Sequence, residues 1–464
     1  MILSARRLTA MLRIGATALT LLNCTSKSED HTVAQKPVHL VTVDPGHFHA
    51  ALVQKSMYDD VDSVIHVYAP AGPDVEMHLA RIDNFNKRAE NPTRWNEVVY
   101  TGADFFDKML TQKSGNVVVL AGNNEKKTEY IARAIGAGFN VLGDKPMAID
   151  GKGFDLLKTA FTEAASKKLL LYDIMTERYE ISTILQKELS QLPEVFGVLE
   201  AGTPENPSVT KESVHHFFKY VSGSILTRPP WFMDVKQEGE GIVDVTTHLV
   251  DLVQWECFPE QAIDYTHDIE IQKAKRTKTP MTLSQFKAIT KLDAFPGYLQ
   301  SMVKSDTVLE VYSNGEINYK IKNVHARVSV IWNYQAPEGA GDTHYSIMRG
   351  TKANLIIRQG KEEQFKPTLY IEPLKVDGYE AVLAGQFRKI QDKYAGVELK
   401  KNAKGWEVVI PEQYKEGHEA HFGRVMEKFL GYLKNGDMPA WEVPNMLAKY
   451  YTTTKALEVA VKEP

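Results

Sequence analysis

The sequence predicts an α/β protein with an N-terminal doubly wound domain, built on a parallel sheet, and an α+β domain with a large, mostly antiparallel open sheet. Short apolar runs alternate with helix-like stretches over residues 37–155, the order that gives a parallel sheet with crossover helices. Beyond about residue 265, runs with strand-like alternation predominate. The chain has 464 residues, which is too many for one ordinary core, so at least two domains are expected.

The first domain is expected to contain short, buried strands. VHLVTV (38–43) and SVIHVYA (63–69) are apolar runs, and NVVVLAG (116–122) is β-branched without alternation, as in a strand buried on both faces. A helix-like stretch over residues 126–138 follows, and the glycines near its end favour termination there. FNVLGDKPMAI (139–149) then resumes extended structure. This order of elements predicts one crossover unit of a parallel sheet.

The second domain is assigned to residues 156–464. Asn314-Gly315 lies between alternating apolar runs, a pattern typical of a β-hairpin turn. Two helix-like stretches, 420–436 and 446–461, end the chain. We expect these two helices to pack back on the first domain.

The N-terminus is typical of an exported bacterial lipoprotein. Arg6 and Arg7 precede a short apolar run and then Cys24, so residues 1–24 are interpreted as a signal peptide with lipidation at Cys24. A plain secretory signal with an incidental cysteine is the alternative. Residues 25–36 are polar and are expected to act as a linker. The expected location is the periplasm or the outer membrane, with the lipid anchor as the only contact with the membrane.

Composition excludes several other classes. The formal net charge of −4 shows no basic excess, so a nucleic-acid partner is not expected. The hydrophobic fraction of 43% and the charged fraction of 25% are those of a globular protein. Cys257 is the only cysteine besides Cys24, which excludes a multi-cysteine metal site and chemistry by paired cysteines.

The loop after the first strand occupies the place of a dinucleotide-binding phosphate loop. Against Gly-x-Gly-x-x-Gly it reads Asp44, Gly46 and His49, so only the middle glycine is present, the one that lets the backbone approach a diphosphate. We assign Gly46, His47, Phe48 and His49 to cofactor binding, with the two imidazoles as hydrogen-bond donors to phosphate. Metal binding by the two histidines needs a third ligand, whose position the sequence does not give, and no metal is predicted.

Two further groups of residues suggest acid–base chemistry. Lys145 directly follows a predicted parallel strand, at the edge of the sheet where ligands bind in open α/β folds. An ammonium group there can stabilise the alkoxide form of a substrate hydroxyl. Asp244 and His248 are four residues apart, so on a helix they share one face, and Asp251 stays near it. A carboxylate beside an imidazole suits a general acid or base.

These residues resemble the nicotinamide-dependent Gfo/Idh/MocA sugar oxidoreductases. Asn123-Asn124, Ala137-Gly138 and Asp144-Lys145-Pro146 stand where that family has Pro-Asn, Ala-Gly and Glu-Lys-Pro, and Gly239 and Gly241 precede the Asp/His pair as its glycines do. The resemblance implies a Rossmann-like first domain, NAD or NADP as the cofactor, and a homo-oligomer paired through the open sheet. It further implies catalysis by Lys145, Asp244 and His248, and cofactor contacts from Asn123, Asn124, Asp144 and Lys145. Arg178-Tyr179 stands where the family has an Arg-Phe element, so Arg178 is assigned to substrate binding, with an ordinary helix salt bridge as the alternative. Asp251 and Trp231 are also assigned to substrate binding, Trp231 as a sugar-stacking wall with a plug in the core as the alternative.

The predicted function is NAD(P)-dependent oxidation or reduction at a hydroxyl of a sugar or glycoside, by hydride transfer. One alternative is a glycosidase that uses transient oxidation to cleave a glycosidic bond. The other is a non-catalytic carbohydrate-binding protein that has lost its cofactor together with the glycines of its loop.

Overall fold

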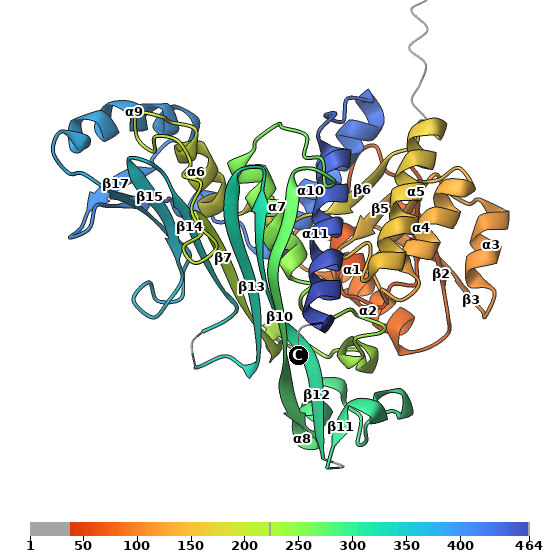
Figure 1. Cartoon of the computed structure of the whole chain (residues 1–464). Coiled ribbons are helices and arrows are strands. Elements are labelled where there is room, and N and C mark those ends of the chain that lie inside the picture. Colours follow the sequence, from red (N-terminus) through yellow and green to blue (C-terminus); the bar gives the residue numbers. More distant parts are fainter. Residues whose placement is uncertain (1–37, 222–223, 306, 339, 463–464) are drawn as a thin grey trace, which may run out of the picture. The chain divides into compact units, whose positions relative to one another are not determined.

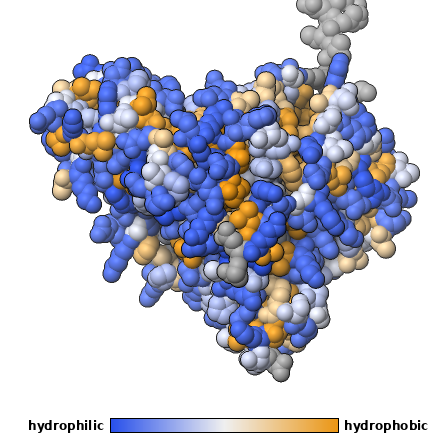
Figure 2. Space-filling model, viewed as in Figure 1, coloured by the Kyte–Doolittle hydropathy of each residue, from blue (hydrophilic) through white to orange (hydrophobic). Residues whose placement is uncertain are grey.

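The computed structural model describes residues 38–221, 224–305, 307–338 and 340–462. The predicted signal peptide, Cys24 and the linker lie outside the described residues. The remainder, from Pro37 onward, forms one compact unit (Figure 1). Among the described residues, no helix is both long enough and apolar enough to cross a membrane. Hydrophilic residues predominate on the face seen in Figure 2.

The first sheet has six parallel strands in the order β3-β2-β1-β4-β5-β6. This is the doubly wound order, with the strand order reversing between β1 and β4. Its short central strands are fully buried because helices cover the sheet, as their unbroken apolar runs predicted. The strands are β1 (Leu40–Val43), β2 (Val64–Ala69), β3 (Asn96–Thr101), β4 (Val117–Leu120), β5 (Asn140–Asp144) and β6 (Leu171–Ile174).

The helices between these strands include an unusually short first one, α1, with five residues. They are α1 (His49–Val53), α2 (Pro73–Lys87), α3 (Phe105–Gln112), α4 (Lys127–Gly136) and α5 (Gly151–Lys167). The first domain extends further than predicted, because the boundary placed at residue 155 falls inside α5 and β6 still pairs with β5.

The second sheet has ten strands, of which nine follow the order β10-β12-β13-β7-β14-β15-β16-β18-β17 while β11 pairs with β12. All pairs are antiparallel except β13 with β7, so the predicted mostly antiparallel sheet is confirmed. Its strands are β7 (Val209–Phe218), β10 (Ile269–Thr282), β11 (Val303–Lys304), β12 (Val308–Ile321), β13 (Val324–Gln335), β14 (Thr343–Arg349), β15 (Ala353–Arg358), β16 (Thr368–Pro373), β17 (Glu398–Lys401) and β18 (Trp406–Val409). A separate two-stranded ribbon joins β8 (Tyr220–Val221) to β9 (Ser224–Ile225).

The helices after β6 are α6 (Ile181–Ser190), α7 (Thr246–Cys257), α8 (Leu283–Thr290), α9 (Tyr379–Lys393), α10 (His418–Asn435) and α11 (Glu442–Lys462). Figure 1 shows α10 and α11 between the two sheets. Phe422 and Phe429 of α10 and Tyr450 of α11 are fully buried in the hydrophobic core of the first domain. The C-terminal segment of the chain thus completes the core of its N-terminal domain.

The hairpin turn predicted at Asn314-Gly315 is wrong. Strand β12 runs straight through both residues, and the turn to β13 comes later, at Lys322. A Cβ on Gly315 would lie 2.6 Å from the Cα of Ile242, so glycine here allows another segment to cross the strand closely. Asn314 Oδ1 accepts a hydrogen bond from the N–H of Trp332 at 2.7 Å. The pair therefore serves a close contact and not a turn.

Candidate active site

The candidate active site is a cavity of about 1210 Å³ at the carboxyl edge of the parallel sheet. The loop after β1, the residue after β5, the first turn of α7 and strands β7 and β14 all contribute to its walls. Its polar lining includes His47, His49, Lys145, Glu177, His215, His216, Lys219, Asp244, His248, Asp342, His344 and His418. Lys145 and His248, about a hundred residues apart in the chain, line the same cavity, as the sequence predicted.

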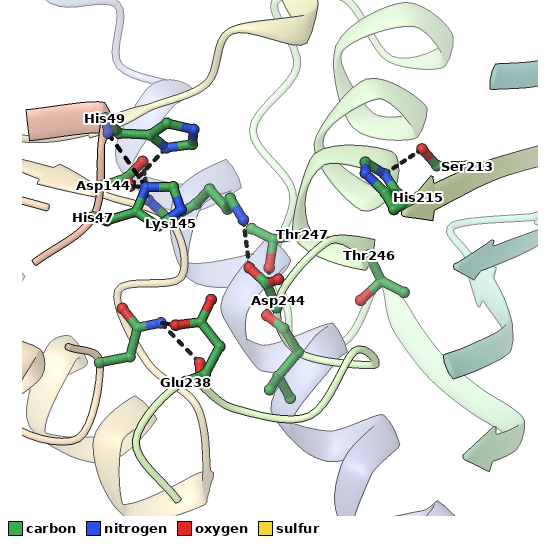
Figure 3. Close-up of polar contacts among 12 residues, drawn as sticks. His47, His49, Asp144, Lys145, Ser213, His215, Glu238, Asp244, Thr246 and Thr247 are labelled. Atoms are coloured by element: carbon green, nitrogen blue, oxygen red, sulfur yellow. Dashed lines mark hydrogen bonds and ion pairs between the residues drawn. The ribbon is translucent and has the colours of Figure 1, made fainter. Parts of the chain in front are cut away.

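Lys145 forms an ion pair with Asp244 across this cavity (Figure 3). Both side chains are buried, with 10% and 6% of their surface exposed. Burial opposes the charge on Lys145, but the carboxylates of Asp244 and Asp144 outweigh it and raise the pKa of the lysine. Lys145 therefore carries a permanent ammonium group that faces the cavity.

Asp244 is held by a tight crossing of two chain segments. Gly241 lies so close to β12 that a Cβ there would be 1.8 Å from the carbonyl oxygen of Ser313. The N–H of Asp244 then donates to the carbonyl of Glu240 at 3.0 Å, in a turn that ends before α7 begins at Thr246. Asp244 lies before α7, so the prediction that Asp244 and His248 share one face of a helix is wrong. The carboxylate of Asp244 forms its ion pair with Lys145 and not with the imidazole of His248.

His248 lies in the first turn of α7, half-buried in the cavity wall. Burial and the nearby ammonium of Lys145 lower the pKa of His248 to about 4. Its Nδ1 atom is buried and has no hydrogen-bond partner among the described residues. The imidazole is consequently neutral at pH 7 and is able to accept a proton.

Asn123 and Asn124 follow β4 but do not line the cavity. The amide of Asn123 donates to Gln237 Oε1 at 2.7 Å, and the amide of Asn124 donates to the carbonyl of Glu238 at 2.7 Å. Their side chains thus fix the segment that leads to Asp244, and the cofactor contacts assigned to them stay a prediction. Burial and the charge of Asp244 raise the pKa of Glu238 well above its usual range.

The loop after β1 has few free groups with which to hold a dinucleotide diphosphate. The N–H of Gly46 donates to the carbonyl of Asp44 at 2.8 Å, and that of His47 donates to Ala121 at 3.1 Å. The N–H of His49 is directed at His47 Nδ1, 3.3 Å away. In the usual phosphate loop such groups point to the ligand at the start of a long helix, whereas α1 has only five residues.

Trp231 and Asp74 lie against the open side of Gly46. A Cβ on Gly46 would be 2.9 Å from both Asp74 Oδ2 and Trp231 Cζ2, and the indole Nε1 donates to Asp74 Oδ2 at 2.7 Å. Trp231 is 8% exposed and does not line the large cavity, so the sugar-stacking wall expected of it is not formed. The indole occupies the space above the loop.

The carboxyl groups of Asp44 and Asp74 make the loop still less suited to bind a diphosphate. Burial and the proximity of Asp74 raise the pKa of Asp44 to about 6, and burial raises the pKa of Asp74 itself. A diphosphate would bring more negative charge beside them. The loop in this arrangement therefore does not fit a dinucleotide diphosphate, although Lys145 and His248 suit the reacting end of such a cofactor. Binding requires Trp231 and Asp74 to move away from Gly46.

Arg178 and Asp251 do not reach the cavity either. Arg178 Nε and Nη2 donate to both oxygens of Asp251 at 2.7 Å, and Nη1 donates to Glu442 at 3.1 Å. Lys449 also donates to Asp251, at 2.9 Å. All four residues are buried, so the substrate contacts predicted for Arg178 and Asp251 are replaced by a buried ion-pair network that joins three helical segments.

Several polar residues of the cavity carried no recognisable sequence motif. Asp342, which lines the same cavity as Lys145, accepts from His216 Nδ1 at 3.0 Å and from Lys219 at 2.8 Å. Glu177 lies 3.4 Å from His418 Nε2. In the sequence, Asp342 follows a glycine and has no motif around it, and His418 is the first residue of α10. Only folding brings these residues to the cavity, so local patterns could not identify them.

Residues 185–461 match the protein family described as "Putative oxidoreductase C terminal domain". The crystal structure of "a putative oxidoreductase" from Parabacteroides merdae is 57% identical, covers 92% of this chain and 98% of its own, and gives a TM-score of 0.91. Levoglucosan dehydrogenase in complex with NADH and levoglucosan is 12% identical, with coverages of 92% and 98% and a TM-score of 0.58. GenD2 from gentamicin A biosynthesis, in complex with NAD, is 16% identical, with coverages of 92% and 95% and a TM-score of 0.53.

No curated protein matches the chain. The two sheets and their order define the fold of the Gfo/Idh/MocA-type dehydrogenases, with a Rossmann-like first domain. The chain itself belongs to the oxidoreductase family defined by the matched C-terminal domain.

Proposed function

We propose that this protein is an oxidoreductase that acts on a hydroxyl group of a sugar or glycoside, with NAD or NADP as the hydride partner. The observation that carries the proposal is that Lys145, Asp244 and His248 line one large cavity, where Lys145 and Asp244 form an ion pair. The site lies at the carboxyl end of β5, where ligands bind in this fold. The nicotinamide complexes of levoglucosan dehydrogenase and GenD2, which share the fold, support the choice of cofactor.

Lys145, His248 and Asp244 each have a separate role in moving the hydroxyl proton. Lys145 donates a hydrogen bond to the substrate hydroxyl oxygen and stabilises the negative charge that develops there. His248, neutral at pH 7, accepts the hydroxyl proton. Asp244 holds the ammonium in position and keeps it charged. A bound nicotinamide would supply the acceptor for the hydride.

Purified full-length protein tests the proposal directly. Denaturation should release a nicotinamide chromophore, or the protein should bind added NAD or NADP and reduce it in the presence of sugars. Lys145→Met should abolish this reduction, whereas Lys158→Met, at an exposed lysine, should not. Product analysis on aryl glycosides separates a ketone product from cleavage of the glycosidic bond.

A second candidate is a non-catalytic carbohydrate-binding protein. The contact of Trp231 and Asp74 with Gly46 favours it, because the loop is filled by the protein itself. Sugar binding by calorimetry without any affinity for NAD or NADP would establish this candidate and exclude the enzyme.

We also propose, from the sequence alone, that the protein is exported and anchored by a lipid on Cys24, and that it forms a homo-oligomer through the open sheet. Metabolic labelling with a fatty acid, with Cys24→Ser as the control, tests the anchor. Light scattering of the purified chain tests the oligomer.

A further inference from the structure

We infer that His47, His49 and Asp144 form a binding site for a divalent transition-metal ion of the zinc class, open to the cavity. One possible ligand atom from each side chain lies within 4.8 Å of the other two. His49 Nδ1 is 2.9 Å from Asp144 Oδ2, and His47 Nδ1 is 3.8 Å from the same oxygen. Ligands that bind one zinc ion at about 2.0–2.2 Å lie roughly 3–3.5 Å from one another. Small side-chain adjustments would therefore place an ion among the three atoms.

The types of ligand indicate the class of ion. Two imidazoles and one carboxylate are a set that zinc and first-row metals such as cobalt and iron accept, whereas magnesium and calcium prefer oxygen ligands alone. Figure 3 shows both imidazoles directed at the carboxylate of Asp144. The donors are also well sheltered, since the side chains of His49 and Asp144 are 9% and 4% exposed.

The surroundings orient these ligands. The backbone N–H of Lys145 donates to Asp144 Oδ1 at 3.0 Å, which leaves Oδ2 turned towards the imidazoles. Without an ion, His49 donates an Nδ1 proton to Oδ2 at 2.9 Å. With an ion, Nδ1 becomes a ligand, and the neutral ring carries its proton on Nε2. His47 Nδ1 gives up only the 3.3 Å contact with the N–H of His49.

The site also has room for an external ligand. His47 and His49 line the large cavity, so a three-residue site leaves coordination positions open to water or to an oxygen of a bound molecule. The nearby ammonium of Lys145 is already paired with Asp244, which reduces its repulsion of a cation. The ion would thus present a hydroxyl, carbonyl or carboxylate oxygen beside Lys145.

Metal titration of the full-length chain, produced without a histidine tag and stripped with a chelator, tests the inference. We expect one equivalent of Zn²⁺ by calorimetry and one equivalent of Co²⁺ by its visible absorption, with Mg²⁺ bound much more weakly. His47→Ala and Asp144→Asn should each lower the affinity by at least about tenfold. His216→Ala is the matched control, because His216 faces the same cavity beside another carboxylate, that of Asp342.

Absence of binding by the wild-type chain would overturn the inference, as would binding that His47→Ala leaves unchanged. Loss of binding in His216→Ala alone would place the ion at His216 and Asp342 and would also overturn it. Circular dichroism identifies any variant that has failed to fold. The side chain of His47 is 13% exposed and accepts only the 3.3 Å contact from the N–H of His49, so at least His47→Ala should keep the fold. The result does not depend on NAD or on sugar turnover.

Discussion

Replacement of Arg178 by methionine separates a structural role of this arginine from the substrate contact that the sequence suggested. The change removes the bidentate contact with Asp251 and the contact with Glu442. Asp251 keeps Lys449 as a partner at 2.9 Å, but Glu442 keeps only the hydroxyls of Tyr172 and Tyr432, at 3.3 and 3.5 Å. Among the described residues, this carboxylate, whose side chain is 0% exposed, then has no ion-pair partner within 4 Å.

Breaking a buried ion pair on one side costs about 3–5 kcal/mol, because the remaining charge stays desolvated. We expect Arg178→Met to lower the free energy of unfolding by about that amount. Unfolding in urea, followed by fluorescence and circular dichroism, measures the change. Arg133→Met is the control. Its guanidinium is 41% exposed and pairs at the surface with Asp107 and Glu129, so the expected loss is about 0–1 kcal/mol.

The folded fraction of Arg178→Met should retain the KM of the wild-type protein for its sugar. If Arg178→Met is too unstable to purify, Arg178→Lys keeps the charge but loses the bidentate geometry, and an intermediate loss of about 1–3 kcal/mol is expected. A loss below 1 kcal/mol together with a raised KM would refute the structural role and restore the substrate contact.

Three further outcomes follow from the site. Lys145→Met should lower kcat/KM by about 10²–10³-fold or more, because the donor to the developing alkoxide is removed, with Lys158→Met unchanged. The acid limb of the pH profile of kcat/KM should fall near pH 4 and not near 6.5, because His248 must be neutral and its pKa is lowered to about 4; a limb at 6.5 would contradict this assignment. Asp74→Asn should tighten NAD binding by about 3- to 10-fold in a direct titration. The change removes a carboxylate beside the expected diphosphate position and weakens the hydrogen bond that holds Trp231. An unchanged affinity would show that Asp74 and Trp231 do not obstruct the loop.

Local sequence patterns predicted the parts of the fold that depend on local physics. The unbroken β-branched run of β4 required burial on both faces, and the strand–helix–strand order required a parallel sheet. The position of Lys145 after β5 follows from the same topology, since side chains at the carboxyl ends of parallel strands meet at one edge. The topology accounts for Lys145 alone, whereas His248, on α7, was assigned to the same site by the resemblance to the family.

Contacts between distant residues could not be predicted in the same way. Asp144 was assigned to cofactor binding, and nothing in the sequence joins it to the two histidines, of which His49 lies 95 residues earlier. Arg178 was assigned to substrate binding from the resemblance to the family, and its buried partner Glu442, 264 residues away, could not be identified from the sequence. Asn314-Gly315 has the composition of a turn, but the approach of Ile242 from another segment gives the glycine a different purpose.

The placement of α10 and α11 affects when the N-terminal domain can complete its folding during synthesis. Lys449 pairs with Asp173 of β6 at 2.6 Å, and the hydroxyl of Tyr450 donates to the same carboxylate at 2.9 Å. Domains usually fold in order as they leave the ribosome. Here the N-terminal domain is synthesised first, but its edge strand β6 gains these partners only after the last few dozen residues of the chain have been synthesised. Fragments that stop before residue 418 should therefore aggregate or be degraded, even though they encode every strand of the parallel sheet.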